Sequence, residues 1–97
     1  MERYEFRYPA SERVPRRAHV GVVGSGDLEV LLEPSEAGEA RVAIRTSVDG
    51  YGAVWKRVLD RFFERWAGAA SIEINDFGAT PGMVTLRLEQ AAEESRS

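Results

Sequence analysis

Large apolar side chains between Tyr51 and Trp66 recur at the spacing of an α-helix, and this run constrains the fold more than any other part of the chain. They stand at positions i, i+3, i+4, i+7 and i+8: Tyr51, Val54, Trp55, Val58, Leu59, Phe62, Phe63 and Trp66. Such a stripe predicts an amphipathic helix with one face against a core, and aromatic residues at this spacing are typical of packing rather than of a cofactor site. Asp49 or Ser47 is expected to cap its start, and Gly68 lies just past its end.

Elsewhere the apolar residues alternate with polar ones, which is the period of a half-buried strand. Alternation of this kind runs through residues 4–8, 18–23, 27–32, 41–46, 71–76 and 83–88. The polar residues 90–97 that follow are expected to form a flexible tail. These elements predict an α+β fold, a two-layer sandwich in which one long amphipathic helix covers one face of a mostly antiparallel sheet of five or six strands.

Length, charge and cysteine content exclude several classes of protein. With 97 residues the chain has room for one domain, residues 1–97. The net charge of −3 is mild and no block of one sign stands out, so neither nucleic acid nor a membrane surface is an expected partner. No apolar run is long enough to cross a bilayer and residues 1–9 lack a secretory signal pattern, which predicts a cytoplasmic protein. The absence of cysteine excludes disulfides and thiol chemistry by the protein's own side chains.

A serine between two glycines, Gly24-Ser25-Gly26, separates two predicted strands and suits a tight hairpin with an accessible hydroxyl. A serine nucleophile needs a base within hydrogen-bonding distance. His19 is the only histidine, and in the predicted hairpin it lies about 13 Å from the tip at roughly 3.3 Å per residue, too far to activate Ser25. The GSG sequence also fits an anion-binding nest, although it matches no phosphate-loop motif. The residues alone leave an ordinary glycine-rich hairpin and a binding turn as alternatives.

Two further patterns do not define a site by themselves. The DFG triplet at 76–78 matches the metal-binding triplet of protein kinases, but the chain lacks the lysine strand and catalytic loop that give the triplet its function. The outer face of the predicted helix carries basic residues, among them Arg57, Arg61 and Arg65, which either face solvent or meet an acidic partner or the phosphates of a ligand. No metal-ligand cluster is visible, so the sequence indicates neither a catalytic nor a metal site.

Four segments occur in a specific order: GVVGSGDLEVLLEP at 21–34, TSVDG at 46–50, INDFGATPG at 74–82 and VTLRLEQ at 84–90. Together they resemble the acyl carrier, or delta, subunit of malonate decarboxylase, over residues 3–94. The acyl carrier (gamma) chain of citrate lyase is more weakly similar, through Ser25-Gly26-Asp27, an Asp-x-Gly-Ala segment at 76–79 and LRLE at 86–89. The malonate-type DFGATPG distinguishes the two.

The resemblance implies that Ser25 is joined by a phosphodiester to 2′-(5″-phosphoribosyl)-3′-dephospho-CoA. The thiol of this arm carries acetyl, exchanges it for malonyl and presents the malonyl thioester for decarboxylation. Such chemistry requires an imported sulfur, because the chain has no cysteine. Gly24 and Gly26 then leave room for the transferase and for the arm. Asp27, which the family shares, either orients the hydroxyl, contacts the transferase or only ends the hairpin.

The resemblance also implies a carrier that is not itself an enzyme. Its expected partners are an acyl transferase subunit, two carboxyltransferase-like decarboxylase subunits and a prosthetic-group transferase, with the basic residues of the helix as docking candidates. Fatty-acid carrier proteins are four-helix bundles with an Asp-Ser-Leu signature that this chain lacks, so 4′-phosphopantetheine is not expected on Ser25. The alternatives are a carrier of a citrate lyase-type complex, an unmodified structural subunit and a hydrolase that acts through Ser25.

Overall fold

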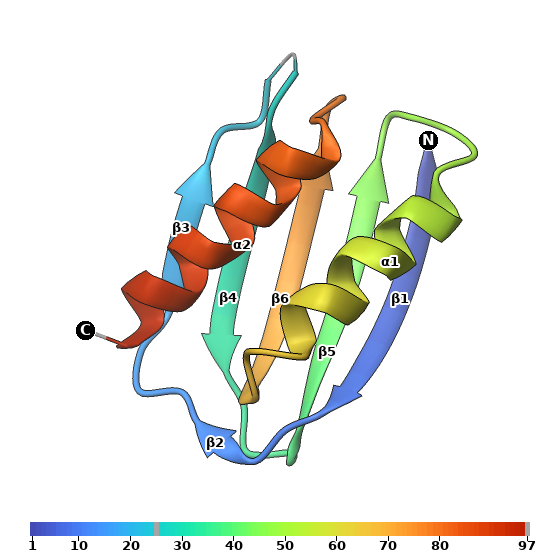
Figure 1. The fold of residues 1–97 in the computed structure, drawn as a ribbon. Helices are drawn as coiled ribbons and strands as arrows, with labels where there is room; N and C mark the ends of the chain where they lie inside the picture. The colour runs from blue at the N-terminus through green and yellow to red at the C-terminus, as the bar shows by residue number, and fades with distance from the viewer. Residues whose placement is uncertain (25, 97) are drawn as a thin grey trace.

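Six strands form the sheet of the computed structural model, which describes residues 1–24 and 26–96 (Figure 1). They are β1 (Glu2–Pro9), β2 (Glu12–Arg13), β3 (Ala18–Gly21), β4 (Leu28–Pro34), β5 (Glu39–Thr46) and β6 (Gly68–Asp76). Their order across the sheet is β1-β5-β6-β4-β3, and β2 pairs with β6 off this path. The β1–β5, β4–β6 and β3–β4 pairs are antiparallel, whereas β5–β6 and β2–β6 are parallel. The predicted α+β class and mostly antiparallel sheet are therefore confirmed.

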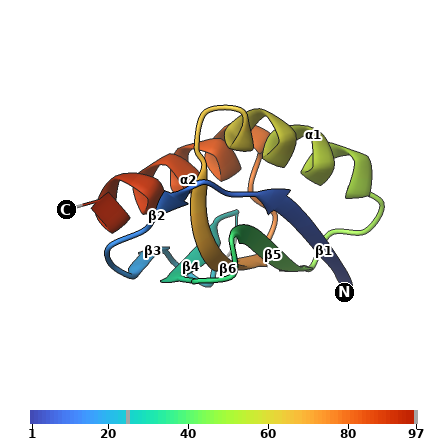
Figure 2. The same ribbon diagram turned by 90° about the horizontal axis from the view of Figure 1, so that it is seen from below.

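Two helices, α1 (Gly52–Phe63) and α2 (Pro81–Arg96), occur in the described residues, and Figure 2 shows both on the same face of the sheet. α1 confirms the helix predicted from the apolar spacing, and it buries Trp55 and Leu59. It connects β5 to β6, and a crossover of this kind lets consecutive strands pair in parallel. The predicted cap is wrong, because Tyr51 is the N-cap residue and no side chain there accepts a hydrogen bond.

The strand predicted at 83–88 is wrong, since these residues belong to α2, and the prediction of a single helix is wrong with it. Val84 and Leu88 are buried, whereas Leu86 between them is 46% exposed. In a strand all three side chains would point to the same face, while in a helix only residues three or four positions apart do so. The burial pattern is therefore helical, although the sequence alternates.

The first turn of α2 carries signals that the alternation masked. The Oγ1 atom of Thr80 accepts a hydrogen bond from the N–H of Met83 at 3.2 Å, and Pro81 occupies the first helical position, where a missing N–H is tolerated. The helix then continues to Arg96, so residues 90–96 form its last turns rather than a separate tail. Buried side chains in this part are Ala91, Ala92 and Ser95.

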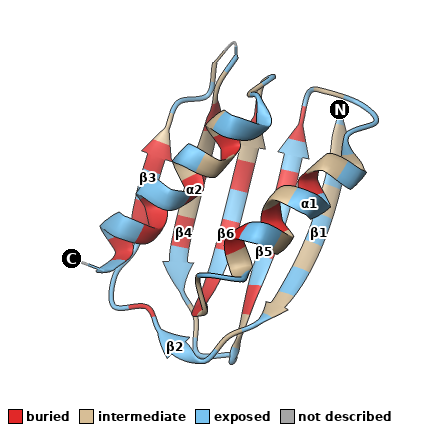
Figure 3. Ribbon diagram, in the orientation of Figure 1, coloured by how far each residue is buried: buried red, intermediate tan, exposed pale blue. Residues whose placement is uncertain are grey.

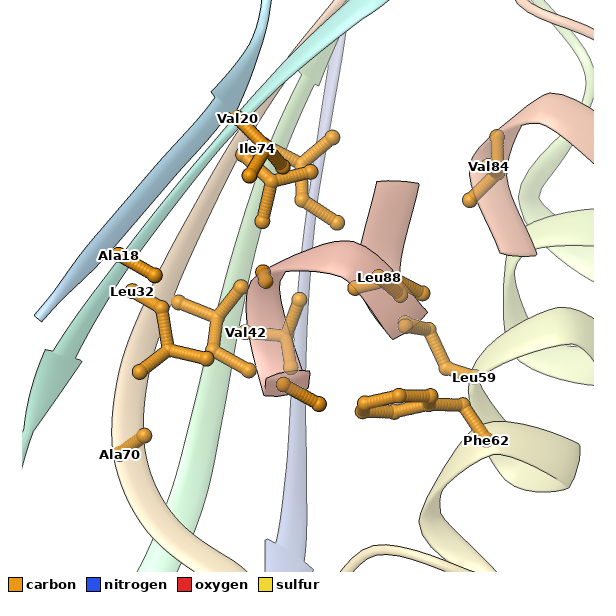
Figure 4. Close-up of a cluster of buried hydrophobic side chains, with 14 of the residues drawn as sticks. Ala18, Val20, Leu32, Val42, Leu59, Phe62, Ala70, Ile74, Val84 and Leu88 are labelled. Atoms are coloured by element: carbon orange, nitrogen blue, oxygen red, sulfur yellow. The ribbon is translucent and has the colours of Figure 1, made fainter. Parts of the chain in front are cut away.

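The core lies between the two helices and the face of the sheet that they cover, where Figure 3 shows the buried residues. Val42 and Ile74 of the sheet converge with Leu59 of α1 and Leu88 of α2 in Figure 4, and all four are buried. The helices therefore cover the apolar side chains that point to one face of the sheet from strands in which buried and exposed residues alternate. Within the part of the chain that the structure describes, no helix is long and apolar enough to cross a membrane.

Candidate functional site

Residues 22–24 and 26–27 lie between β3 and β4 in the chain, at the end of the sheet where β3 ends and β4 begins (Figure 1). The strand predicted to run on to residue 23 is wrong, because pairing stops at Gly21 and the next two residues are exposed. Gly21 has a φ of +81°, and a Cβ there would collide with the carbonyl oxygen of Leu28, so only glycine lets the chain leave the ladder at this point. The connection is longer than the three residues predicted. Ser25, the predicted attachment residue, lies outside the described residues.

The turn is hydrogen-bonded to the segment that follows β6. The N–H of Gly26 donates to the carbonyl oxygen of Phe77 at 2.8 Å, and the N–H of Phe77 donates to the carbonyl oxygen of Asp27 at 2.9 Å. Within the turn, the N–H of Asp27 donates to the carbonyl oxygen of Gly24 at 3.1 Å. These three bonds hold the backbone on both sides of residue 25, although this part of the chain lies beyond the paired strands.

The two glycines of the turn differ in what the fold requires of them. A Cβ added to Gly24 or to Gly26 would meet no other atom within 4 Å, leaving aside chain neighbours. Gly26 has a φ of +76°, a conformation that residues with a side chain rarely adopt, whereas the φ of Gly24 is not positive. The conformation thus explains glycine at 26, and nothing in the described structure requires glycine at 24. The space around both positions is open.

Asp27 forms an ion pair with Arg87 of α2. Arg87 donates from Nη2 to Oδ2 at 2.8 Å and from Nε to Oδ1 at 3.2 Å, and the exposed fractions of the two side chains are 23% for Arg87 and 18% for Asp27. These bonds, followed by a bond from the Leu28 N–H to Oδ1, hold the pKa of Asp27 below its ordinary value of 3.8. Sequence reasoning missed Arg87, because it placed this residue in a strand. The Thr80-Pro81 helix start was the signal that could have placed it on α2.

Asp76 organises the loop between β6 and α2. Its side chain is 3% exposed and accepts hydrogen bonds from Thr46 Oγ1 at 2.8 Å, from the Ala79 N–H at 3.0 Å and from the Gly78 N–H at 3.3 Å. The DFG triplet therefore has a structural role here, in keeping with the prediction that its match to kinases is coincidental. Gly78 has a φ of +94°, and a Cβ added to it would lie 4.0 Å from the backbone nitrogen of Gly26. This loop and the GSG turn therefore pack closely together.

His19 lies on the exposed face of the sheet. Its Nε2 atom is 2.9 Å from Oε2 of Glu29, and the other oxygen of Glu29 accepts a hydrogen bond from Nδ2 of Asn75 at 2.9 Å. In this position His19 is a surface residue of β3 whose polar neighbours are Glu29 and, through it, Asn75. No group of three or more side chains that could hold a metal ion occurs in residues 1–24 and 26–96.

A groove of about 770 Å³ runs between α1 and α2. Its walls carry the three arginines of the predicted basic face, Arg57, Arg61 and Arg65, together with apolar side chains. The Nη2 atom of Arg65 lies 3.9 Å from Oε2 of Glu89, which makes a long ion pair. Neither Arg57 nor Arg61 forms an ion pair with a residue that the structure describes. The docking candidates therefore share one groove with several apolar side chains.

The fold and the site define a class of small α+β domain in which a glycine turn at one end of the sheet is held by a second loop and by a helix. The family model described as Malonate decarboxylase delta subunit (MdcD) matches residues 15–95, which include the turn, the loop and the helix up to residue 95. The chain belongs to this family, and the resemblance recognised in its sequence is confirmed.

Relatives share about half of the sequence along nearly its whole length. The malonate decarboxylase acyl carrier protein of Pseudomonas syringae pv. tomato is 53% identical over 95 residues, which cover 97% of this chain and 96% of the relative. That of Azotobacter vinelandii is 51% identical over 98 residues, with the same shares covered. A chain in the crystal structure of a Pseudomonas malonate decarboxylase hetero-tetramer in complex with malonate matches with a TM-score of 0.92 at 49% identity, over 97% of this chain and 98% of that chain.

Proposed function

We propose that this protein is the acyl carrier subunit of a malonate decarboxylase, and that Ser25 bears 2′-(5″-phosphoribosyl)-3′-dephospho-CoA through a phosphodiester. The observation that carries the proposal is the relationship itself. Relatives named malonate decarboxylase acyl carrier protein match 97% of the chain at about 50% identity, and the family model spans the GSG turn. When bound, the arm supplies the thiol that this cysteine-free chain lacks, so that an acetyl or malonyl group can be carried as a thioester.

The residues beside Ser25 suit an attached group of this kind. A Cβ at position 24 or 26 would meet no other atom within 4 Å, so the turn offers space to a bulky substituent and to the enzyme that attaches it. The carboxylate of Asp27 is paired with Arg87. This pairing offsets a negative charge that would otherwise repel a phosphodiester on Ser25, two residues earlier in the chain. The role of the chain is to hold the attachment point on a rigid scaffold.

The proposed function requires partner subunits. The structural relative is part of a hetero-tetramer, and we propose that this chain likewise works with an acyl transferase subunit, two carboxyltransferase-like decarboxylase subunits and a prosthetic-group transferase. The chain is then not itself an enzyme. It raises the effective concentration of the acyl group at each active site, because a tethered group does not diffuse away. Arg57 and Arg61, which lack a described ion-pair partner, are candidates for docking.

The intact mass of protein purified from its own host, with its assembly factors present, tests this proposal. The wild type and Ser47→Ala, which alters an exposed serine in another loop, are expected to carry an adduct of coenzyme size, and Ser25→Ala is expected to lack it. A wild-type protein without any adduct would contradict the proposal and favour an unmodified structural subunit. An adduct with the mass of 4′-phosphopantetheine alone would contradict the proposed phosphoribosyl-dephospho-CoA group.

A further inference from the structure

A cavity of about 210 Å³ lies where α1 begins and where the loop after β6 leads into α2. This is the end of the molecule at which β3 ends and β4 begins (Figure 1). The cavity walls are mainly apolar and come from both helices and the loop: Val54, Trp55, Val58, Ala79, Pro81 and Val84. The space suits a neutral, apolar group of several heavy atoms.

The rim of this cavity touches the turn. Gly78 lines the cavity, and a Cβ added to it would lie only 4.0 Å from the backbone nitrogen of Gly26. The preceding residue, Phe77, accepts the hydrogen bond of the Gly26 N–H. Residue 25 precedes Gly26 in the chain, so an arm bonded to it starts beside this rim. The free end of a flexible arm can therefore fold back into the cavity.

The charges around the cavity select among possible occupants. Asp76 lies on its wall, 3% exposed, and its carboxylate is bound by one hydroxyl and two N–H groups but by no cation among the described residues. Arg57 and Arg61 line the neighbouring interhelical groove and not this cavity. A second carboxylate placed here would be desolvated and would face the charge of Asp76, both of which are unfavourable. A neutral acyl group meets neither penalty.

We propose that this cavity is the resting site of the acetylated end of the arm, and that it does not admit the malonylated end. The inference rests on the proposed function. The acetyl group is sheltered from water between turnovers, whereas the charged malonyl group stays outside, where a partner subunit reaches it. Burial of one methyl group shifts the equilibrium between the exposed and the sheltered acetyl group about fourfold toward the sheltered form. Because only the exposed thioester meets water, its hydrolysis slows by about the same factor.

The test uses holo-protein loaded by exchange with a ¹³C-acetyl thioester. In the wild type, the acetyl methyl signal is expected to be shifted by the ring of Trp55 and to show cross-peaks to the methyl groups of Val54 and Val84. Ala79→Leu fills the cavity and is expected to return the signal to its free position and to shorten the lifetime of the thioester about fourfold by intact mass. Ala53→Leu adds the same atoms at an exposed position outside the cavity and is expected to change neither.

A second variant, Val54→Phe, fills the cavity from α1 and keeps the test decisive if Ala79→Leu disturbs the loop. A ¹³C-malonyl arm is expected to give its free-solution signal in every variant, and cross-peaks from malonyl to the cavity residues would overturn the exclusion. An arm that is present by mass, with the acetyl signal at its free position in the wild type, overturns this inference alone. A protein without the arm mass overturns the proposed function and this inference together.

Discussion

The two glycines that flank Ser25 are expected to respond in opposite directions to the same substitution. Gly26 has a φ of +76°, and forcing a residue with a side chain into the left-handed region costs roughly 1–2 kcal/mol. Alanine also restricts the unfolded chain, which offsets about 0.4–1 kcal/mol of that cost. Gly26→Ala is therefore expected to lower the free energy of unfolding by about 1 kcal/mol. Gly24→Ala meets no atom and has no positive φ, so it is expected to raise that free energy by about 0.5 kcal/mol.

Thermal unfolding followed by circular dichroism measures the difference. In a domain of this size about 1 kcal/mol corresponds to roughly 4–8 °C in Tm. The Tm of Gly26→Ala is therefore expected to fall by about that amount, and the Tm of Gly24→Ala to rise by a few degrees. Gly26→Asn is the control, because asparagine tolerates a positive φ better than alanine does, and it is expected to recover part of the loss. Equal shifts for the two alanine variants would refute the assignment of a conformational role to Gly26 and not to Gly24.

The same variants separate folding from attachment of the arm. Gly24→Ala leaves the fold intact by the argument above, so a loss of the adduct in that variant would show that the transferase needs the open space at position 24. Retention of the adduct would show that this space is not required. Intact mass after expression in the native host distinguishes the two results.

Two further predictions concern α2 and the ion pair. Leu88→Ala is expected to lower the free energy of unfolding by about 2–5 kcal/mol, because the side chain is buried, and Leu86→Ala by no more than about 0.5 kcal/mol; similar losses in denaturant unfolding would contradict the helical face. The pKa of Asp27 is depressed in the folded state, so its contribution to stability is present above the ordinary value of 3.8 and is lost as the pH falls through the folded pKa. Asp27→Asn and Arg87→Ala are therefore expected to lose less stability than the wild type between pH 5 and pH 2, and an unchanged acid dependence of urea unfolding would count against the pair.

The two helices show what periodicity can and cannot predict. α1 was predictable because its apolar residues follow a helical period over its whole length, which no strand reproduces. In α2, Val84, Leu86 and Leu88 alternate as in a strand, and the later core positions are the small residues Ala91, Ala92 and Ser95, which contribute little to an apolar pattern. The choice between helix and strand was made by packing against the sheet, which leaves Leu86 in solvent.

The sequence by itself determined the family, the α+β class, five of the six predicted half-buried strands, the aromatic helix and the GSG segment. These are properties of neighbouring residues, and their patterns are legible one segment at a time. Only the tertiary structure decided what holds the turn, because Arg87 is 60 positions from Asp27, and Phe77 lies beside Gly26 because β6 pairs with β4. It also decided that Gly24, Asp76 and the small apolar cavity lie at the same end of the molecule. Contacts between distant segments depend on how the helices pack on the sheet, and the local periodicity of the sequence does not predict that packing.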